Sequence, residues 1–262
     1  MTSALRPFVR WLSGRVLPPL AYPVVRGPLR GKRFILRSAA GEGGGASIYV
    51  NTVEPQKTRA LLGILRAGQV VFDIGANIGY YTILASQQVG PLGRVLAFEP
   101  YARNVKYLER HVSLNHADNV TIVPVACAER SALERFVMGT DSATGHLSSE
   151  STAREEGKTL IVPAAAVDDL VRAFGLMPDV MKVDVEGAEE RVLRGAAKTL
   201  ADARPILLLA VHSVALRAAC TSYLLRFGYP EPSIWADVEG DTELLFMPAG
   251  HRPDAPAPGH EA

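Results

Sequence analysis

The sequence has few cysteines, no excess of either charge and no long uninterrupted apolar run. Cys127 and Cys220 are the only cysteines among 262 residues, and no Cys/His cluster has zinc-ligand spacing. This pattern argues against a disulfide scaffold and a structural zinc site. Twenty-eight basic and 27 acidic residues leave a formal charge of +1, so the overall charge does not favour a nucleic-acid partner. We therefore expect a cytoplasmic protein that does not bind nucleic acid.

Arginines interrupt the apolar residues of the N-terminal segment, Met1 to Leu20. The segment therefore lacks the apolar run that a membrane-spanning helix or a secretory signal needs. Its apolar residues do share one helical face, which predicts a short basic amphipathic helix. Packing on the main domain or on a second copy in a homodimer is the favoured use of this face. Contact of residues 1–20 with a membrane surface stays open as an alternative.

The chain is predicted to have three parts. Residues 1–56 form an N-terminal extension, residues 57–250 form one main domain, and residues 251–262, rich in Pro, Gly and Ala, form a disordered tail. Within the extension, Lys32–Arg37 and Ser47–Val53 predict two strands of a hairpin joined by a glycine-rich turn.

Helical and apolar patterns alternate along the main domain, which predicts a parallel sheet covered by helices on both faces. A final hairpin is expected to add an antiparallel edge to this sheet. The predicted strands are Val70–Ile74, Arg94–Phe98, Val120–Val125, Leu160–Val162, Val180–Val185, Pro205–Val211, Ser233–Asp237 and Glu243–Met247. The principal predicted helices are 57–66, Tyr80–Gln88, Ala102–Leu114, Ala188–Leu200 and Val214–Phe227. The irregular stretch from Met138 to Thr159 suits an active-site loop or a plain surface loop.

The first strand-to-helix turn has the features of a cofactor loop. Gly75 and Gly79 follow the strand, and glycine lets the backbone approach a ligand closely. Asp73 is the last residue but one of the strand, and Glu99 lies at the end of the next strand, 20 residues beyond Gly79. A carboxylate at that second position can accept hydrogen bonds from both hydroxyls of an adenosine ribose. The alternative is that Asp73 only caps the helix and Glu99 only ends a strand beside Pro100.

A dinucleotide and S-adenosylmethionine would both place an adenosine ribose beside Glu99, but they carry opposite charges near Asp73. The pyrophosphate of a dinucleotide would lie near Asp73, and like charges a few ångströms apart at an effective dielectric of about 20 cost on the order of a few kcal/mol. S-adenosylmethionine (SAM) has no phosphate and carries a sulfonium and an ammonium group. We therefore expect SAM, with an NAD-dependent oxidoreductase as the less favoured alternative.

Between Lys57 and His212 the sequence resembles the FkbM family of class I SAM-dependent methyltransferases. The matching segments are Phe72–Tyr80, Ala97–Pro100, Val167–Leu170 and Lys182–Glu189. The resemblance implies a Rossmann-like α/β fold with a seven-stranded, mostly parallel sheet that has one antiparallel edge strand. It also implies SAM above the first two strands and methylation of a hydroxyl on a sugar, glycan or polyketide-like molecule. The candidate cofactor residues are Asp73, Gly75, Asn77, Gly79, Glu99, Pro100 and Glu186.

Three side chains are expected to meet beside the acceptor. Asp184 and Glu186 follow one strand and His212 follows the next, and open α/β sheets bind ligands at the carboxyl ends of their strands. Asp184 is the favoured base or acceptor-orienting group, with His212 as the alternative base. Glu186 either binds the donor's amino group or stabilises the turn. Two alternatives stay open: a buried Lys182–Asp184 ion pair with a purely structural His212, or a divalent ion held by Asp184, Glu186 and His212.

Other acceptor classes fit this sequence less well. The turn Asp184–Gly187 lacks the Asn/Asp-Pro-Pro-aromatic pattern of base-amine methylation, and neither cysteine follows proline as a cytosine-methylating nucleophile often does. Enzymes similar to this one often carry Glu two residues before the histidine, where this sequence has Ala210. The sequence therefore predicts an O-methyltransferase acting on a small molecule or carbohydrate. A SAM-binding protein without catalysis is the alternative.

Overall fold

The computed structural model describes residues 20–35, 46–50, 53–138, 145–147, 158–238, 241–248 and 250. Four predictions fall partly or wholly outside these residues: the amphipathic N-terminal helix, the glycine-rich turn, most of the 138–159 loop and the C-terminal tail. In the part of the chain that is described, no helix combines the length and hydropathy needed to cross a bilayer.

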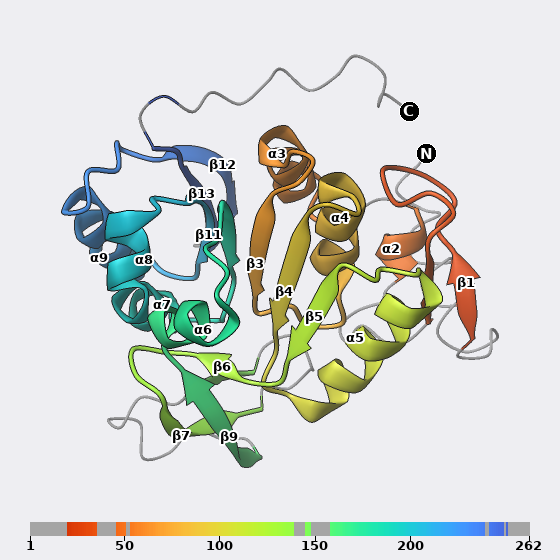
Figure 1. Ribbon diagram of the computed structural model, residues 1–262, viewed down its shortest axis with the longest axis horizontal. Coiled ribbons are helices and arrows are strands. Elements are labelled where there is room, and N and C mark those ends of the chain that lie inside the picture. Colours follow the sequence, from red (N-terminus) through yellow and green to blue (C-terminus); the bar gives the residue numbers. More distant parts are fainter. Residues whose placement is uncertain are drawn as a thin grey trace.

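A seven-stranded sheet forms the centre of the fold, in the order β12-β13-β11-β10-β3-β4-β5 (Figure 1). Five neighbouring strands are parallel, and β13 alone runs in the opposite direction, between β11 and β12. The bounds are β3 Val70–Ile74, β4 Arg94–Phe98, β5 Val120–Val123, β10 Val180–Val183, β11 Ile206–Val211, β12 Ser233–Val238 and β13 Asp241–Phe246. The predicted seven-stranded, mostly parallel α/β fold is confirmed, with the antiparallel strand one place in from the edge.

Helices cover both faces of this sheet because the strands are apolar on both faces. Val71 packs with α3 and α4 on one face, whereas its neighbour Phe72 packs with α6, α7 and α9 on the other. Figure 1 shows these two groups of helices on opposite sides of the strands. The bounds are α3 Pro55–Ile64, α4 Tyr80–Val89, α5 Ala102–Leu114, α6 Val167–Phe174, α7 Glu189–Gly195, α8 Ala197–Asp202 and α9 Val214–Leu225.

The predicted helix Ala188–Leu200 is wrong as a single element, because it divides into α7 and α8 near Ala196. Gly195 explains the close packing at this break. A Cβ atom at Gly195 would lie 2.0 Å from the carbonyl oxygen of Ala128. Glycine therefore lets the helix approach the neighbouring backbone.

A second, four-stranded sheet lies beyond β5, in the order β6-β9-β7-β8. The sequence pattern did not indicate a separate sheet here. Its strands are β6 Ala126–Cys127, β7 Ala132–Val137, β8 His146–Leu147 and β9 Thr159–Ala165. The predicted strand Leu160–Val162 lies within β9, so it extends this small sheet and not the main one.

The N-terminal hairpin differs from the prediction. β1 (Ala21–Pro23) pairs with β2 (Arg33–Ile35), whereas the predicted strand Ser47–Val53 is wrong, because α2 occupies Ala46–Tyr49. The β-branched and aromatic residues of that segment suggested a strand. Burial of Ile48 in the core and a hydrogen bond from the Tyr49 hydroxyl to the Phe34 carbonyl instead accompany a short helix.

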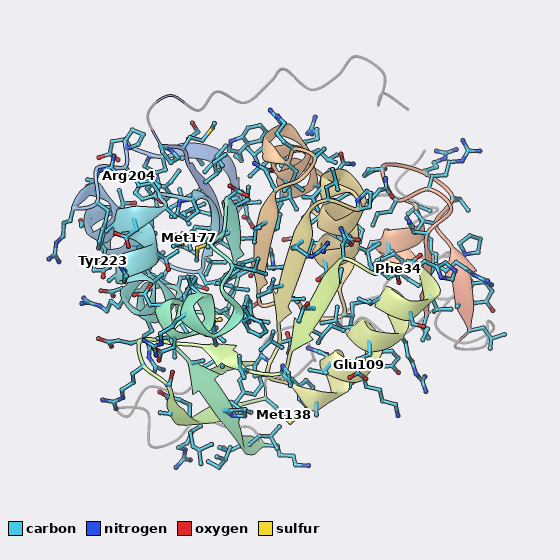
Figure 2. The ribbon with its side chains drawn as sticks, in the orientation of Figure 1. Phe34, Glu109, Met138, Met177, Arg204 and Tyr223 are labelled. Carbon is cyan, nitrogen blue, oxygen red and sulfur yellow. The ribbon has the colours of Figure 1, made fainter. Side chains whose placement is uncertain are left out.

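Buried polar side chains of α5 and of Asn115, the residue after it, hold β2 against the main domain. Nε2 of His111 accepts a hydrogen bond from the Ile35 backbone N–H at 3.0 Å, so Nδ1 carries the proton that it donates to the Ile78 carbonyl at 2.7 Å. The ring of Phe34, labelled in Figure 2, packs 4.8 Å from the His111 ring between centroids. Asn115 adds a bond in each direction with the Arg33 backbone.

Candidate active site

A cavity of about 500 Å³ opens at the carboxyl ends of the central strands. This is where an open α/β sheet binds its ligands. The predicted site residues that line it are Gly75, Asn77, Glu99, Pro100, Asp184, Glu186 and His212. Asp73 and Gly79 do not line the cavity.

The two loop glycines are required by backbone geometry. Gly75 has a φ of 76°, and a Cβ there would lie 1.9 Å from the carbonyl oxygen of Asp184. Gly79 has a φ of 94°, precedes the first residue of α4, and would drive a Cβ into Leu108. Glycine thus lets the loop after β3 lie against both β10 and α5.

Glu99 is fixed by three hydrogen bonds. Its carboxylate accepts from the backbone N–H groups of Asn77 at 2.9 Å and Tyr101 at 3.0 Å, and from the Asn104 amide at 3.3 Å. Burial raises the pKa of Glu99, and these three hydrogen bonds oppose the rise. Each carboxylate oxygen can accept about two hydrogen bonds, so about one acceptor position, on Oε2, remains for a ribose hydroxyl.

The side-chain oxygen of Asn77 is buried and finds no hydrogen-bond donor among the described residues. Asn77 lines the cavity and adopts a φ of 51°, in the left-handed region that asparagine tolerates better than most residues. A buried acceptor without a donor costs on the order of 1–3 kcal/mol. An ammonium or hydroxyl group of a bound donor molecule would remove that cost, so the loop fits a ligand such as SAM.

The charge of Asp73 is compensated within the protein. One oxygen accepts a hydrogen bond from the Thr82 hydroxyl at 2.6 Å, and the other lies 3.2 Å from the Lys182 ammonium. Lys182 also donates to the Gly75 carbonyl at 2.8 Å. Asp73 and Lys182 therefore stabilise the loop that contains Gly75. Asp73 therefore adds no uncompensated negative charge next to the cavity.

Asp184 is held by two lysines from different elements. Lys57 of α3 lies 2.9 Å from Oδ2 of Asp184, and Lys182 of β10 lies 3.8 Å from the same oxygen. Burial alone would raise the pKa of Asp184, but the two ammonium groups outweigh it and hold that pKa well below its ordinary value. Asp184 is therefore an ionised carboxylate with little tendency to take a proton.

His212 faces several carboxylates. Its Nε2 lies 3.6 Å from both Asp184 and Glu189, and its Nδ1 lies 4.0 Å from Glu186. The interaction with Asp184 raises the pKa of His212 to about 9, against the opposing effect of burial. At neutral pH His212 is thus an imidazolium, and in that state it cannot serve as the predicted alternative base.

Glu186 and Glu189 divide the roles considered for the turn after β10. Glu189 is buried, and its Oε1 accepts hydrogen bonds from the backbone N–H groups of Val185 at 3.2 Å and Gly187 at 3.1 Å. Glu189 therefore stabilises the turn. Glu186 instead lines the cavity, where it can meet a ligand.

A carboxylate absent from β11 has a counterpart on β13. Ala210 pairs directly with Glu243, and residues opposite each other in adjacent strands project from the same face of a sheet. Oε1 of Glu243 lies 2.7 Å from the Lys57 ammonium. Glu243 thus places a carboxylate in this cavity next to Ala210, the β11 position where similar enzymes often carry Glu.

Asp184, Glu186 and His212 offer ligand atoms that all lie within 4.8 Å of one another. The spacing would suit a divalent ion, but the local charges oppose one. Lys57 already supplies a cation beside Asp184, and His212 would have to lose its proton before it could coordinate. The geometry favours an ion-paired arrangement of these three groups.

Sequence reasoning missed Lys57, Glu54, Tyr81 and Glu243. Lys57 is 3% exposed and also contacts Glu54 at 2.8 Å, while the Tyr81 hydroxyl donates to Glu54 at 2.9 Å. No local motif marks these residues, because the cluster is assembled by α3, α4 and β13 together. Only the β11–β13 register would have placed Glu243 in the site.

Comparisons with known proteins agree with this fold. A family model described as methyltransferase FkbM domain matches residues 73–230, more than half of the chain. The crystal structure of methyltransferase FkbM from Methylobacillus flagellatus is similar with a TM-score of 0.53 and 18% identity. That match covers 93% of this chain and 59% of the other, so this chain spans less than two thirds of its length.

A putative rRNA methylase from Clostridium thermocellum has a TM-score of 0.50 and 11% identity, covering 74% of this chain and 93% of that one. A comparison with curated proteins finds no significant match. At these identities the solved structures establish a shared class I methyltransferase-like fold and nothing of the acceptor. The match over residues 73–230 shows that this chain belongs to the FkbM methyltransferase family.

Proposed function

We propose that this protein is a SAM-dependent O-methyltransferase that acts on a hydroxyl of a sugar, a glycan or a polyketide-like small molecule. The observation that carries the proposal is one cavity lined by both sets of residues. We assign the part lined by Gly75, Asn77 and Glu99 to the donor (the donor end) and the part lined by Asp184 and His212 to the acceptor (the acceptor end).

The charge of the cavity supports SAM over a dinucleotide. Among the described residues its lining includes five carboxylates, from Glu54, Glu99, Asp184, Glu186 and Glu243, against Lys57, Lys182 and the His212 imidazolium. An acidic cavity attracts the sulfonium and ammonium groups of SAM and repels a pyrophosphate. Selectivity for SAM thus comes from the residues that line the cavity and not from Asp73, whose charge is compensated by Lys182.

The residues of the chain divide the work of methyl transfer. When bound, SAM supplies an electrophilic methyl group on a sulfonium. In this proposal Glu99 and Asn77 hold the donor, and Glu186, which lines the same cavity, accepts a hydrogen bond from the donor's amino group. Asp184, kept ionised by Lys57, orients the acceptor molecule by accepting a hydrogen bond from it. Holding the reacting atoms in line supplies much of the acceleration in such a displacement.

Calorimetric titration with S-adenosylhomocysteine and with NAD tests the donor. We expect binding of the homocysteine compound and none of NAD. Glu99→Ala removes hydrogen bonds to a charged acceptor, each worth about 1.5–3 kcal/mol, and should weaken binding at least tenfold. Glu109→Ala, on the exposed face of α5, is the matched control. Tight NAD binding without a response to S-adenosylhomocysteine contradicts the proposal.

A panel of methyl glycosides and hydroxylated polyketides, incubated with SAM labelled on its methyl group, tests the acceptor class. The expected product carries the label on an ether oxygen. A SAM-binding protein without catalysis, the second candidate, would bind S-adenosylhomocysteine and label nothing. The replacement of a β11 carboxylate by Ala210 is the feature that favours this candidate.

A further inference from the structure

Glu243 combines a fixed oxygen with an unsatisfied one. Oε1 lies 2.7 Å from the Lys57 ammonium, whereas Oε2 is buried and has no hydrogen-bond partner among the described residues. Rotation about the last torsion of a glutamate is broad and nearly twofold, so either oxygen can face the cavity that this residue lines. A hydroxyl donor entering the cavity would supply the missing hydrogen bond.

The position of Glu243 in the sheet brings it beside the other acceptor-side groups. Because β13 runs antiparallel to β11, its first residues lie at the edge where β10 and β11 end, and Thr242 pairs with Val211. Lys57 bridges Glu243 to Asp184, at 2.7 Å and 2.9 Å. Two carboxylates that share one ammonium are thus placed side by side in the cavity.

The neighbouring groups are poorly suited to remove a proton at neutral pH. Asp184 is ionised by its lysine partners and holds a proton weakly, and His212 is already protonated. Burial raises the pKa of Glu243; Lys57 of α3 opposes this rise, and Asp184 and Glu54 add to it. A buried carboxylate whose pKa is raised is a better general base than an unperturbed one.

We propose that Glu243 is a catalytic residue, which binds the reacting hydroxyl of the acceptor and takes its proton. The inference rests on the proposed function, since it concerns a hydroxyl acceptor. As the bond from the acceptor oxygen to the methyl carbon forms, the methyl–sulfur bond breaks and its electron pair stays on sulfur. The hydroxyl proton passes to a carboxylate oxygen of Glu243, which later releases it to water.

Glu243→Gln tests the role while keeping size and polarity. Loss of a general base should lower kcat by about 10²–10⁴-fold, with KM changed far less. The probe is the methyl glycoside that the wild-type protein methylates fastest, and Glu109→Gln is the matched control on the exposed face of α5. Titration with S-adenosylhomocysteine should give a Kd within about twofold of the wild-type value, because Glu243 lies at the acceptor end.

Moving the carboxylate to the neighbouring strand provides a rescue. Glu243→Ala should lose activity as Glu243→Gln does, and Ala210→Glu added to it should restore a substantial part, because positions 210 and 243 are cross-strand partners. The single variant Ala210→Glu, which keeps Glu243, shows how much activity is lost through the larger side chain on β11 alone. A double variant no more active than Glu243→Ala, while it still binds S-adenosylhomocysteine, contradicts the assigned position of the base.

An NMR titration of the Glu243 carboxyl group tests the role without a measurement of activity. In protein labelled with ¹³C at glutamate carboxyl carbons, the resonance missing from Glu243→Gln is expected to titrate above the ordinary value of about 4.3. Titration below that value overturns the proposal. So does unchanged kcat in Glu243→Gln. Failure of the wild-type protein to methylate any hydroxyl compound, despite binding S-adenosylhomocysteine, instead overturns the proposed function and this role with it.

Discussion

Replacing Lys57 by methionine removes one buried ammonium and keeps a side chain of similar length. Lys57 is 3% exposed, and its Nζ lies 2.7–2.9 Å from the carboxylates of Glu54, Asp184 and Glu243. Glu54 is half exposed and can turn to water, but Asp184 and Glu243 are 20% and 13% exposed. Removing one partner of a buried pair typically costs about 3–5 kcal/mol, and we expect a loss of this size at pH 7.5.

The loss should depend on pH in a defined direction. The folded-state pKa of Asp184 is lowered, so the stabilisation from Lys57 is present above the unfolded pKa near 3.9 and is lost as pH falls through the folded value. The wild-type contribution is therefore constant between pH 7.5 and pH 4.5. In Lys57→Met the buried carboxylates lose their cation, so burial raises their pKa values and they take up protons in this range, which relieves the cost of burying their charge. The difference between the two proteins should therefore shrink between pH 7.5 and pH 4.5.

Urea unfolding followed by circular dichroism measures both effects, because the midpoint shifts when stability changes. Lys198→Met is the matched control, since Lys198 is an exposed lysine paired with Asp202 on one helix, and its midpoint should not move. A Lys57→Met midpoint equal to that of the wild-type protein at pH 7.5 would refute the reasoning. So would a loss of the same size at both pH values.

Three further outcomes are expected. Gly75→Ala should abolish measurable binding of S-adenosylhomocysteine in calorimetry, since its Cβ would lie 1.9 Å from the Asp184 carbonyl; retained affinity would contradict the loop geometry. The pKa of His111 is lowered by burial to about 4, so wild-type stability should fall as pH drops from 6.5 towards 4, by about 2 kcal/mol at pH 5; His111→Gln should flatten this slope in urea unfolding. Dialysis against EDTA should leave methyl transfer unchanged, and activity restored only by Mg²⁺ or Mn²⁺ would reinstate the ion site.

The main sheet could be predicted because its strands carry a strong local signal. Val70–Ile74 is apolar along its length and ends in a glycine turn, and both bounds of the predicted strand match β3. The segment Ser47–Val53 carries a similar composition but folds as a helix at its start. Its conformation depends on burial of Ile48 and on a bond to Phe34, which no local pattern encodes.

The donor end of the site was predictable for the same reason. Glycines, Asn77 and Glu99 lie in two short segments whose spacing reflects a βαβ unit. The acceptor end depends on contacts across the fold, as the Lys57–Asp184 pair joins residues 127 positions apart. Protonation of His212 could not be predicted either, because it results from carboxylates that come together only in the folded chain.

The buried imidazole of α5 hydrogen-bonds to two segments that are distant from each other in the sequence. The Ile35 backbone N–H donates a hydrogen bond to one nitrogen of His111, and the other ring nitrogen donates to the carbonyl of Ile78, the residue after Asn77. Breaking either bond leaves the ring with an unsatisfied nitrogen, so each contact favours the other. Hydrogen exchange at the Ile35 amide should therefore slow when S-adenosylhomocysteine orders the neighbouring loop, which makes the N-terminal extension a reporter of donor binding.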